Sequence, residues 1–262
     1  ARGMGIWQGN YMDLVVDERA NALISDFMHR KIRERVRDPA IAEKLIPWDH
    51  GFGTRRVPHE TNYYEVYNQP NVTLVDLKAT PFKRITPNGV ETSDGFHEMD
   101  MLIYATGFDA VTGAFEAIDI EGVDGQKLKD KWSKGPVTYL GLMVNGFPNF
   151  FMPAGPLSSQ GNIPRTSEYH AEWVARFVRY MDKHGLVYAE PRLEVEQEFM
   201  EHAREAQNRH LSSRVDSWFT GVNTNVDGRT ERRVMQYRDS ADEYRRRAEA
   251  GVTSGYEELI KR

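Results

Sequence analysis

The chain has 262 residues, of which 40% are hydrophobic and 28% charged, with a formal net charge of −5 at pH 7. Its 12 Phe, 12 Tyr and 5 Trp supply enough large side chains for a packed core, which excludes a disordered chain. The acidic balance and the lack of any run of about 20 apolar residues argue against nucleic acid and a membrane as partners.

The sequence contains no cysteine. Disulfide scaffolds, thiol nucleophiles and cysteine-ligated metal sites are therefore excluded. The first residues also lack the long apolar core of a signal peptide. We expect a cytoplasmic protein without a bound metal.

The N-terminal part, residues 17–46, has the pattern of two helices. Apolar residues recur at nearly helical spacing from Leu23 to Val36, between charged residues. Asp38 followed by Pro39 is typical of a helix N-cap and a first helical position, so a second helix is predicted there.

Residues 48–110 change to the pattern of strands. A turn at 87–89 predicts a hairpin between Phe82–Thr86 and Val90–Thr92. The continuous apolar run Met101–Ala105 predicts a strand buried on both faces, which is usual in a parallel sheet.

The C-terminal part mixes strand and helix patterns. Phe147–Met152 is predicted as another buried strand, and it leads to a small, polar loop at 157–164. A long helix should follow, with Thr166 as its cap and Gly185 as its end. Further helices are expected near 194–210 and 240–250. Aromatic and apolar residues four apart on the long helix favour its core face over a substrate cage, and two histidines are expected at the surface: Tyr169, Trp173, Phe177 and Met181, then His170 and His184.

Several catalytic motifs are absent. His59-Glu60 begins like a zinc-protease motif, but Tyr63 stands where the second zinc ligand belongs. Gly51-Phe52-Gly53 begins like a dinucleotide fingerprint, but Arg56 replaces its third glycine. The common hydrolase and nucleotide-triphosphate signatures do not occur.

A more specific signal lies at residues 100–109. The predicted strand ends in Ala105-Thr106-Gly107, whose small side chains would let the backbone approach a bulky cofactor. From these residues alone, an ordinary strand ending in a glycine turn is an equal alternative.

The string D-x-L-I-Y-A-T-G-F-D at 100–109 resembles the segment by which two-dinucleotide-domain flavoproteins cross from the NADP domain back to the FAD domain. Other segments, in the same order, are similar to those of Baeyer–Villiger monooxygenases. The resemblance runs from about 19 to 259 and is to the C-terminal half of that family. Its main carriers are Gly53-Thr54-Arg55-Arg56, Phe147-Pro148-Asn149, Glu172-Trp173-Val174 and Ser217-Trp218-Phe219-Thr220-Gly221-Val222-Asn223.

This resemblance implies an α/β fold, a partial two-dinucleotide-binding-domain (Rossmann-like) flavoprotein with a helical insertion. Residues 1–50 would be the helical insertion of the NADP domain, 51–104 the C-terminal part of that domain, and 105–262 the C-terminal part of the FAD domain. The family's glycine fingerprints and an active-site Asp would lie in an N-terminal half, supplied by the same gene or by a separate chain.

The implied activity is oxygenation of a ketone by O2 to an ester or lactone, with FAD and NADPH as cofactors and a flavin peroxide as the oxidant. Two alternatives are open. The same flavin peroxide would also oxidise a heteroatom, such as a sulfide. A non-catalytic scaffold that binds a partner carrying the missing Rossmann motifs is the other possibility.

The resemblance also implies site residues. Arg56 matches the active-site arginine, a permanent cation that would stabilise developing negative charge and contact the nicotinamide. Arg55 would bind the 2′-phosphate of NADPH, and Trp218 would lie in the loop that closes over NADP. Thr106, Gly107, Asn162 and Ile163 are expected at the flavin, and Leu157, Ser158, Ser159, Gln160 and Gly161 on the substrate side.

Overall fold

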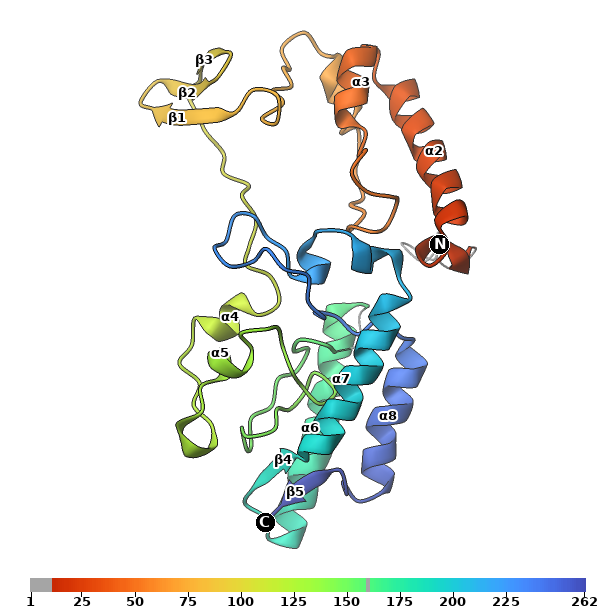
Figure 1. Cartoon of the computed structure of the whole chain (residues 1–262), viewed down its shortest axis with the longest axis vertical. Coiled ribbons are helices and arrows are strands. Elements are labelled where there is room, and N and C mark those ends of the chain that lie inside the picture. Colours follow the sequence, from red (N-terminus) through yellow and green to blue (C-terminus); the bar gives the residue numbers. More distant parts are fainter. Residues whose placement is uncertain (1–10, 159–160) are drawn as a thin grey trace. The chain divides into compact units, whose positions relative to one another are not determined.

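The computed structural model describes residues 11–158 and 161–262. They divide into two compact units, one ending at Gly107 and the other beginning at Phe108. Figure 1 shows helices in both units and small sheets at separate places. The mixed α/β class is confirmed, and the sheets among the described residues are antiparallel.

The first unit begins with a short 3₁₀ helix η1 (Met12–Val15) and two helices, α2 (Glu18–Arg35) and α3 (Pro39–Leu45). Asp38 accepts hydrogen bonds from the backbone of α3, with Pro39 at the first turn, so the predicted cap is confirmed.

Packing between these two helices uses only part of the predicted apolar stripe. Leu23 is 74% exposed, whereas the C-terminal end of α2 is buried against α3. The small core consists of Ile32, Val36, Ala42 and Ile46.

A three-stranded antiparallel sheet follows a 3₁₀ turn, η2 (Glu65–Asn68). Its strands are β1 (Phe82–Thr86), β2 (Gly89–Thr92) and β3 (Gly95–Glu98), in that order. The predicted hairpin is therefore confirmed, with Ile85 opposite Val90.

The strand predicted at Met101–Ala105 is wrong for this structure. The segment has no regular secondary structure, and its apolar side chains are exposed, Ile103 to 80%. Phe108, just beyond it, is 90% exposed. A strand buried on both faces requires neighbouring strands, and no described strand pairs with this segment.

The second unit is built on three long helices, α6 (Ile163–His184), α7 (Leu193–Asn208) and α8 (Ala241–Thr253), which lie side by side in Figure 1. They enclose an aromatic core that includes Trp173, Phe177, Phe199, Tyr237, Tyr244 and Tyr256. The predicted core role of the α6 stripe is confirmed.

Short elements complete this unit. Two strands, β4 (Ala189–Pro191) and β5 (Leu259–Lys261), pair antiparallel. The remaining elements are the helices α4 (Gly113–Glu116) and α5 (Leu128–Lys131) and the 3₁₀ turns η3 (Val123–Gly125), η4 (Leu211–Arg214) and η5 (Trp218–Thr220).

Two further predictions need correction. Phe147–Met152 forms turns with buried ends, not a strand, because its backbone bonds to separate partners: Asn149 N–H to Ala189 O at 2.8 Å and Met152 N–H to Leu142 O at 2.9 Å. Helix α6 begins earlier than expected, with Asn162 as its cap instead of Thr166.

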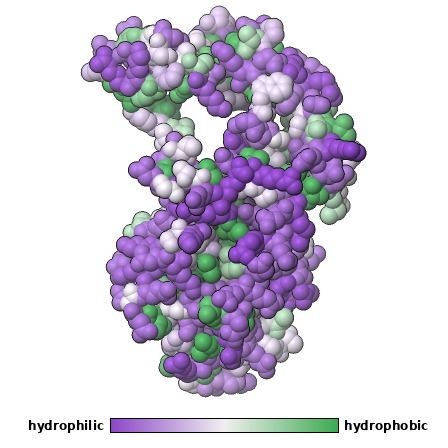
Figure 2. Space-filling view, viewed as in Figure 1, coloured by the Kyte–Doolittle hydropathy of each residue, from purple (hydrophilic) through white to green (hydrophobic). Residues whose placement is uncertain are grey.

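Figure 2 shows a mostly hydrophilic face with small, separate hydrophobic areas. None of the described helices is long and apolar enough to cross a membrane.

His170 is fully buried, which overturns its prediction as a surface histidine. Its Nδ1 accepts from the backbone N–H of Ala154 at 2.8 Å, and its Nε2 lies 2.9 Å from the hydroxyl of Tyr244. Tyr244 in turn donates to the carbonyl of Leu140. This direction of donation requires a neutral ring with its proton on Nε2.

The charge state of His170 follows from its burial, which lowers its pKa to about 4. In the unfolded chain the ring titrates near 6.5. Below that pH the unfolded state binds a proton at His170 that the folded state does not bind. Stability therefore falls as the pH falls from about 6.5 towards 4.

We therefore expect the free energy of unfolding to decrease by roughly 1.4 kcal/mol per pH unit over this interval because of His170. His170→Gln should lower stability at pH 7 by about 1–3 kcal/mol and remove this part of the pH dependence. Urea denaturation at pH 7 and pH 5 measures both effects. His184→Gln, at an exposed position on the same helix, is the control. An unchanged pH dependence in His170→Gln would contradict the assignment.

Candidate functional site

Arg55 and Arg56 follow a tight turn in the first unit. The hydroxyl of Thr54 donates to the carbonyl of Gly51 at 2.7 Å, and Gly53 has a φ of +75°, which glycine adopts without strain. Arg56 is exposed, and no described residue forms an ion pair or hydrogen bond with its guanidinium. The turn therefore presents a cation to its surroundings.

Asn21 on α2 anchors this turn. It is only 5% exposed, and its Nδ2 donates to the carbonyls of Leu14 and Phe52, both at 2.8 Å. The hydroxyl of Ser25, one helical turn later, accepts from the N–H of Phe52 at 2.9 Å. A Cβ at Gly51 would stand 2.0 Å from Asn21 Oδ1, so a side chain there would displace the Asn21 amide from this position.

Arg55 has a carboxylate beside it. Its Nη2 lies 3.2 Å from Asp49 Oδ2. The pKa of Asp49 is held below its usual range, mainly by a hydrogen bond from His50 and also by the charge of Arg55.

Thr106 and Gly107 lie in the exposed segment at the end of the first unit. Gly107 has a φ of +85°, and a Cβ built there would meet no atom within 4 Å. Open space beside a glycine backbone is compatible with close approach of a flat cofactor.

In the second unit, Leu157 and Ser158 are both buried. They lie against the turn at 138–141, where Gly141 permits a very close approach: a Cβ on it would be 2.5 Å from the backbone nitrogen of Ser158. Leu157 itself has a φ of +65°, an uncommon conformation for a branched residue.

Several non-glycine residues of this region share that left-handed backbone, namely Leu140, Ala154 and Leu157. Two of them, Leu140 and Ala154, are also the backbone groups bound by the Tyr244–His170 pair. The buried network thus stabilises a strained loop, a combination that is common at functional sites.

The start of α6 continues this loop. Asn162 Oδ1 accepts from the N–H of Arg165 at 3.2 Å, which fixes the first turn. Ile163 is 58% exposed although it is apolar, and Gly161 is exposed. Ser159 and Gln160, predicted on the substrate side, lie outside the described residues.

Trp218 is 38% exposed at the start of η5, and its ring packs edge-on to Phe219 with centroids 4.4 Å apart. A capping box between Ser217 and Thr220 fixes this turn.

The loop after Trp218 carries a residue whose partners the sequence did not reveal. Arg229 is 6% exposed, and its Nη2 lies 2.6 Å from Glu116 and 3.3 Å from Asp109. It also donates to the hydroxyl of Thr112 at 2.9 Å. These bonds raise the pKa of Arg229 against the opposing effect of burial. They join the loop to the first residues of the second unit.

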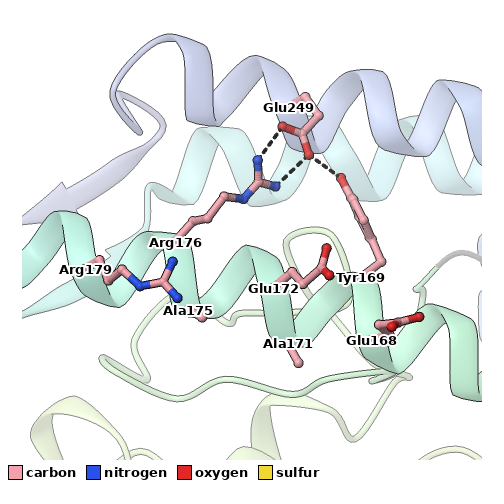
Figure 3. Close-up of a pocket in the computed structure, with 8 residues that line it drawn as sticks. All are labelled: Glu168, Tyr169, Ala171, Glu172, Ala175, Arg176, Arg179 and Glu249. Carbon is pink, nitrogen blue, oxygen red and sulfur yellow. Dashed lines mark hydrogen bonds and ion pairs between the residues drawn. The ribbon is translucent and has the colours of Figure 1, made fainter.

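A surface pocket of about 580 Å³ lies along α6, where Glu249 on α8 accepts bonds from Arg176 and Tyr169 (Figure 3). None of the predicted site residues lines it, and charged side chains dominate its wall: Glu168, Glu172, Arg176, Arg179 and Glu249.

The predicted residues thus fall into two groups. Arg55, Arg56, Thr106 and Gly107 belong to the first unit, and the substrate-side loop and Trp218 belong to the second. Within the described ranges, no cluster of His, Asp or Glu has the arrangement of a metal site.

Replacing Asn21 should loosen the arginine turn. Asn21→Ala leaves the carbonyls of Leu14 and Phe52 without their donor, which should destabilise the first unit by about 1–3 kcal/mol. Amide hydrogen exchange at 51–56 should accelerate relative to the rest of the unit. Asn88→Ala, in an exposed hairpin turn, is the control. Unchanged exchange at 51–56 would show that Asn21 does not hold the turn.

Comparison with known proteins finds relatives over nearly the whole chain. No family model matches the chain. A 2-oxo-Δ3-4,5,5-trimethylcyclopentenylacetyl-CoA monooxygenase of Pseudomonas putida is 43% identical over 256 residues, 97% of this chain and 47% of that protein. A Baeyer–Villiger monooxygenase of Pseudooceanicola batsensis is 39% identical over 97% of this chain and 46% of its own length. A phenazine N-monooxygenase of Lysobacter antibioticus is 37% identical over 96% of this chain and 46% of its own length.

Solved structures give the same result. OTEMO in complex with FAD and NADP superposes with a TM-score of 0.89 at 42% identity, covering 95% of this chain and 46% of that one. Cyclohexanone monooxygenase from Rhodococcus sp. Phi1 bound to NADP+ gives 0.90 at 37% identity, with the same coverage. The chain spans about half the length of the relatives it matches. Over nearly its whole length the chain is similar to the C-terminal half of Baeyer–Villiger monooxygenases.

Proposed function

We propose that the complete protein uses FAD and NADPH to insert one oxygen atom of O2 into a ketone, giving an ester or lactone, and that this chain supplies the C-terminal half of the enzyme. The observation that carries the proposal is the exposed guanidinium of Arg56, which has no ion-pair or hydrogen-bond partner among the described residues, on a turn braced by Asn21. The names of the relatives, among them ketone monooxygenases, support it.

The exposed apolar segment at 101–108 supports the need for further chain. Burying such side chains is favourable by about 25 cal/mol per Å² of apolar surface, and sheet pairing would satisfy their backbone groups. We propose that the N-terminal half, as the same polypeptide or a separate one, covers this segment. A cytoplasmic location stays a prediction.

The cofactors fit the residues present. FAD, once reduced by NADPH, would supply the activation of O2. Arg56 would hold a permanent positive charge where negative charge develops, a role suited to a group that does not lose its proton. Arg55 would face the 2′-phosphate of NADPH, sharing its charge with Asp49.

The other predicted residues would bind the cofactors and the substrate, and they would exclude water from the site. Thr106 and Gly107 would let the backbone approach the flavin, and the N-terminus of α6, at Asn162 and Ile163, would lie beside its ring. Trp218 would cover NADP with an apolar face. The substrate side would be formed by Leu157, Ser158, Ser159, Gln160 and Gly161.

Heteroatom oxygenation is a second candidate, favoured by the similarity to a phenazine N-monooxygenase. Supplying the full-length protein with NADPH and either cyclohexanone or thioanisole separates the two reactions. A lactone product supports the main proposal, whereas sulfoxide alone favours the second. A full-length protein that binds no FAD and oxidises neither compound would support the scaffold alternative.

Arg56→Met in the full-length protein should lower the rate of lactone formation by at least about 100-fold, because a fixed cation at developing negative charge is lost. The flavin absorbance of the purified variant should be unchanged, since Arg56 is not expected to anchor FAD. Arg84→Met, an exposed arginine on β1 that pairs with Glu91, is the matched control. Normal lactone formation by Arg56→Met would exclude its assigned role.

A further inference from the structure

The segment before α8 carries two polar side chains with buried atoms that have no hydrogen-bond partner among the described residues. Gln236 is fully buried, and neither its Nε2 nor its Oε1 has a hydrogen-bond partner among the described residues. Arg238, two residues later, has a buried Nη2 that is also unpartnered. Met235 and Tyr237, which alternate with these two residues along the chain, are also buried.

These unpartnered groups are costly. A buried polar group without a hydrogen bond loses its hydration without compensation, and an unpaired charge loses more. Burial alone lowers the pKa of Arg238 to about 10. The adjacent carboxylate, Asp239, faces Arg209 at 3.1 Å and His202 at 3.4 Å instead. No described carboxylate pairs with Arg238.

The surroundings of Arg238 place it beside a residue of the predicted site. Its guanidinium lies over the ring of Phe219, 4.4 Å from the centroid, and Phe219 packs against Trp218. Stacking on an aromatic ring partly offsets the loss of hydration and fixes the plane of the guanidinium. The charge of Arg238 also helps to lower the pKa of His210, behind the effect of burial.

We propose that Arg238, two residues after the unpartnered Gln236, binds a carboxylate carried by the ketone substrate. The guanidinium offers two parallel N–H donors to a carboxylate, and the amide of Gln236 can donate a further hydrogen bond. A single cation matches a singly charged group better than a phosphate dianion. This inference rests on the proposed ketone oxygenation and adds the substrate class to it.

The test compares an acid with its neutral ester in the full-length enzyme. The probes are 4-oxocyclohexanecarboxylate and methyl 4-oxocyclohexanecarboxylate, with kcat/KM measured for each. Arg238→Met should reduce kcat/KM for the acid by roughly 10- to 100-fold, as expected for one charge-assisted pair, and leave the ester unchanged. Gln236→Leu should have the same selectivity with a smaller effect.

Two further readouts separate binding from folding and from catalysis. The melting temperature of Arg238→Met should be unchanged or higher, because an unpaired buried charge is removed. Titration of tryptophan fluorescence, through Trp218, should show binding of the acid to the wild-type protein and its loss in Arg238→Met. Arg246→Met, an exposed arginine on α8 that pairs with Glu243, is the matched control.

Each alternative outcome has a distinct meaning. Equal losses for acid and ester, or none for the acid, would overturn the proposal. A raised KM for NADPH with the acid unaffected would assign Arg238 to a cofactor phosphate. A large fall in melting temperature with unchanged acid selectivity would mean that a carboxylate of the N-terminal half is the partner. If the wild-type enzyme oxidises neither ketone, the proposed function fails, and the fluorescence titration still decides the carboxylate site.

Discussion

A directed chain of three hydrogen bonds runs through the centre of the second unit, from the N–H of Ala154 to His170, to the hydroxyl of Tyr244 and to the carbonyl of Leu140. It works only with a neutral imidazole, because a protonated ring would place a second donor against the N–H of Ala154. Two helices and two left-handed loop residues depend on this one protonation state. The loop backbone at Leu140 and Ala154 has its shape because the helical core behind it is complete.

The first unit solves a similar problem with a different side chain. An irregular turn that carries two adjacent arginines cannot be held by sheet or helix bonds. The amide of Asn21 and the hydroxyl of Ser25 take over that task from one face of α2. In both units a regular helix therefore supplies polar side chains that satisfy the backbone of an irregular loop, which leaves the outward side chains of the loop available for ligands.

Local signals in the sequence predicted the helices well. Periodicity placed α6, α7 and α8, and Asp38-Pro39 gave the start of α3. Sequence reasoning failed where the determining partner is distant. The buried His170 is paired with Tyr244, 74 residues later in the chain. Arg229 pairs with carboxylates that lie more than a hundred residues earlier. The apolar run at Met101–Ala105 has the composition of a buried strand, but its neighbours are not among the described strands. The roles assigned to the site residues came from resemblance, and they stay predictions.

The close approach of Gly51 to Asn21 has a consequence for sequence variation. A Cβ at 51 would lie only 2.0 Å from the amide oxygen at 21, so a side chain at 51 and the asparagine at 21 would occupy the same space. A side chain at 51 is tolerated only with a shorter residue at 21, and such a pair gives up both amide bonds that hold the arginine turn. Change at position 51 alone is therefore blocked, and a side chain at 51 should occur across related sequences only together with a shorter residue at 21.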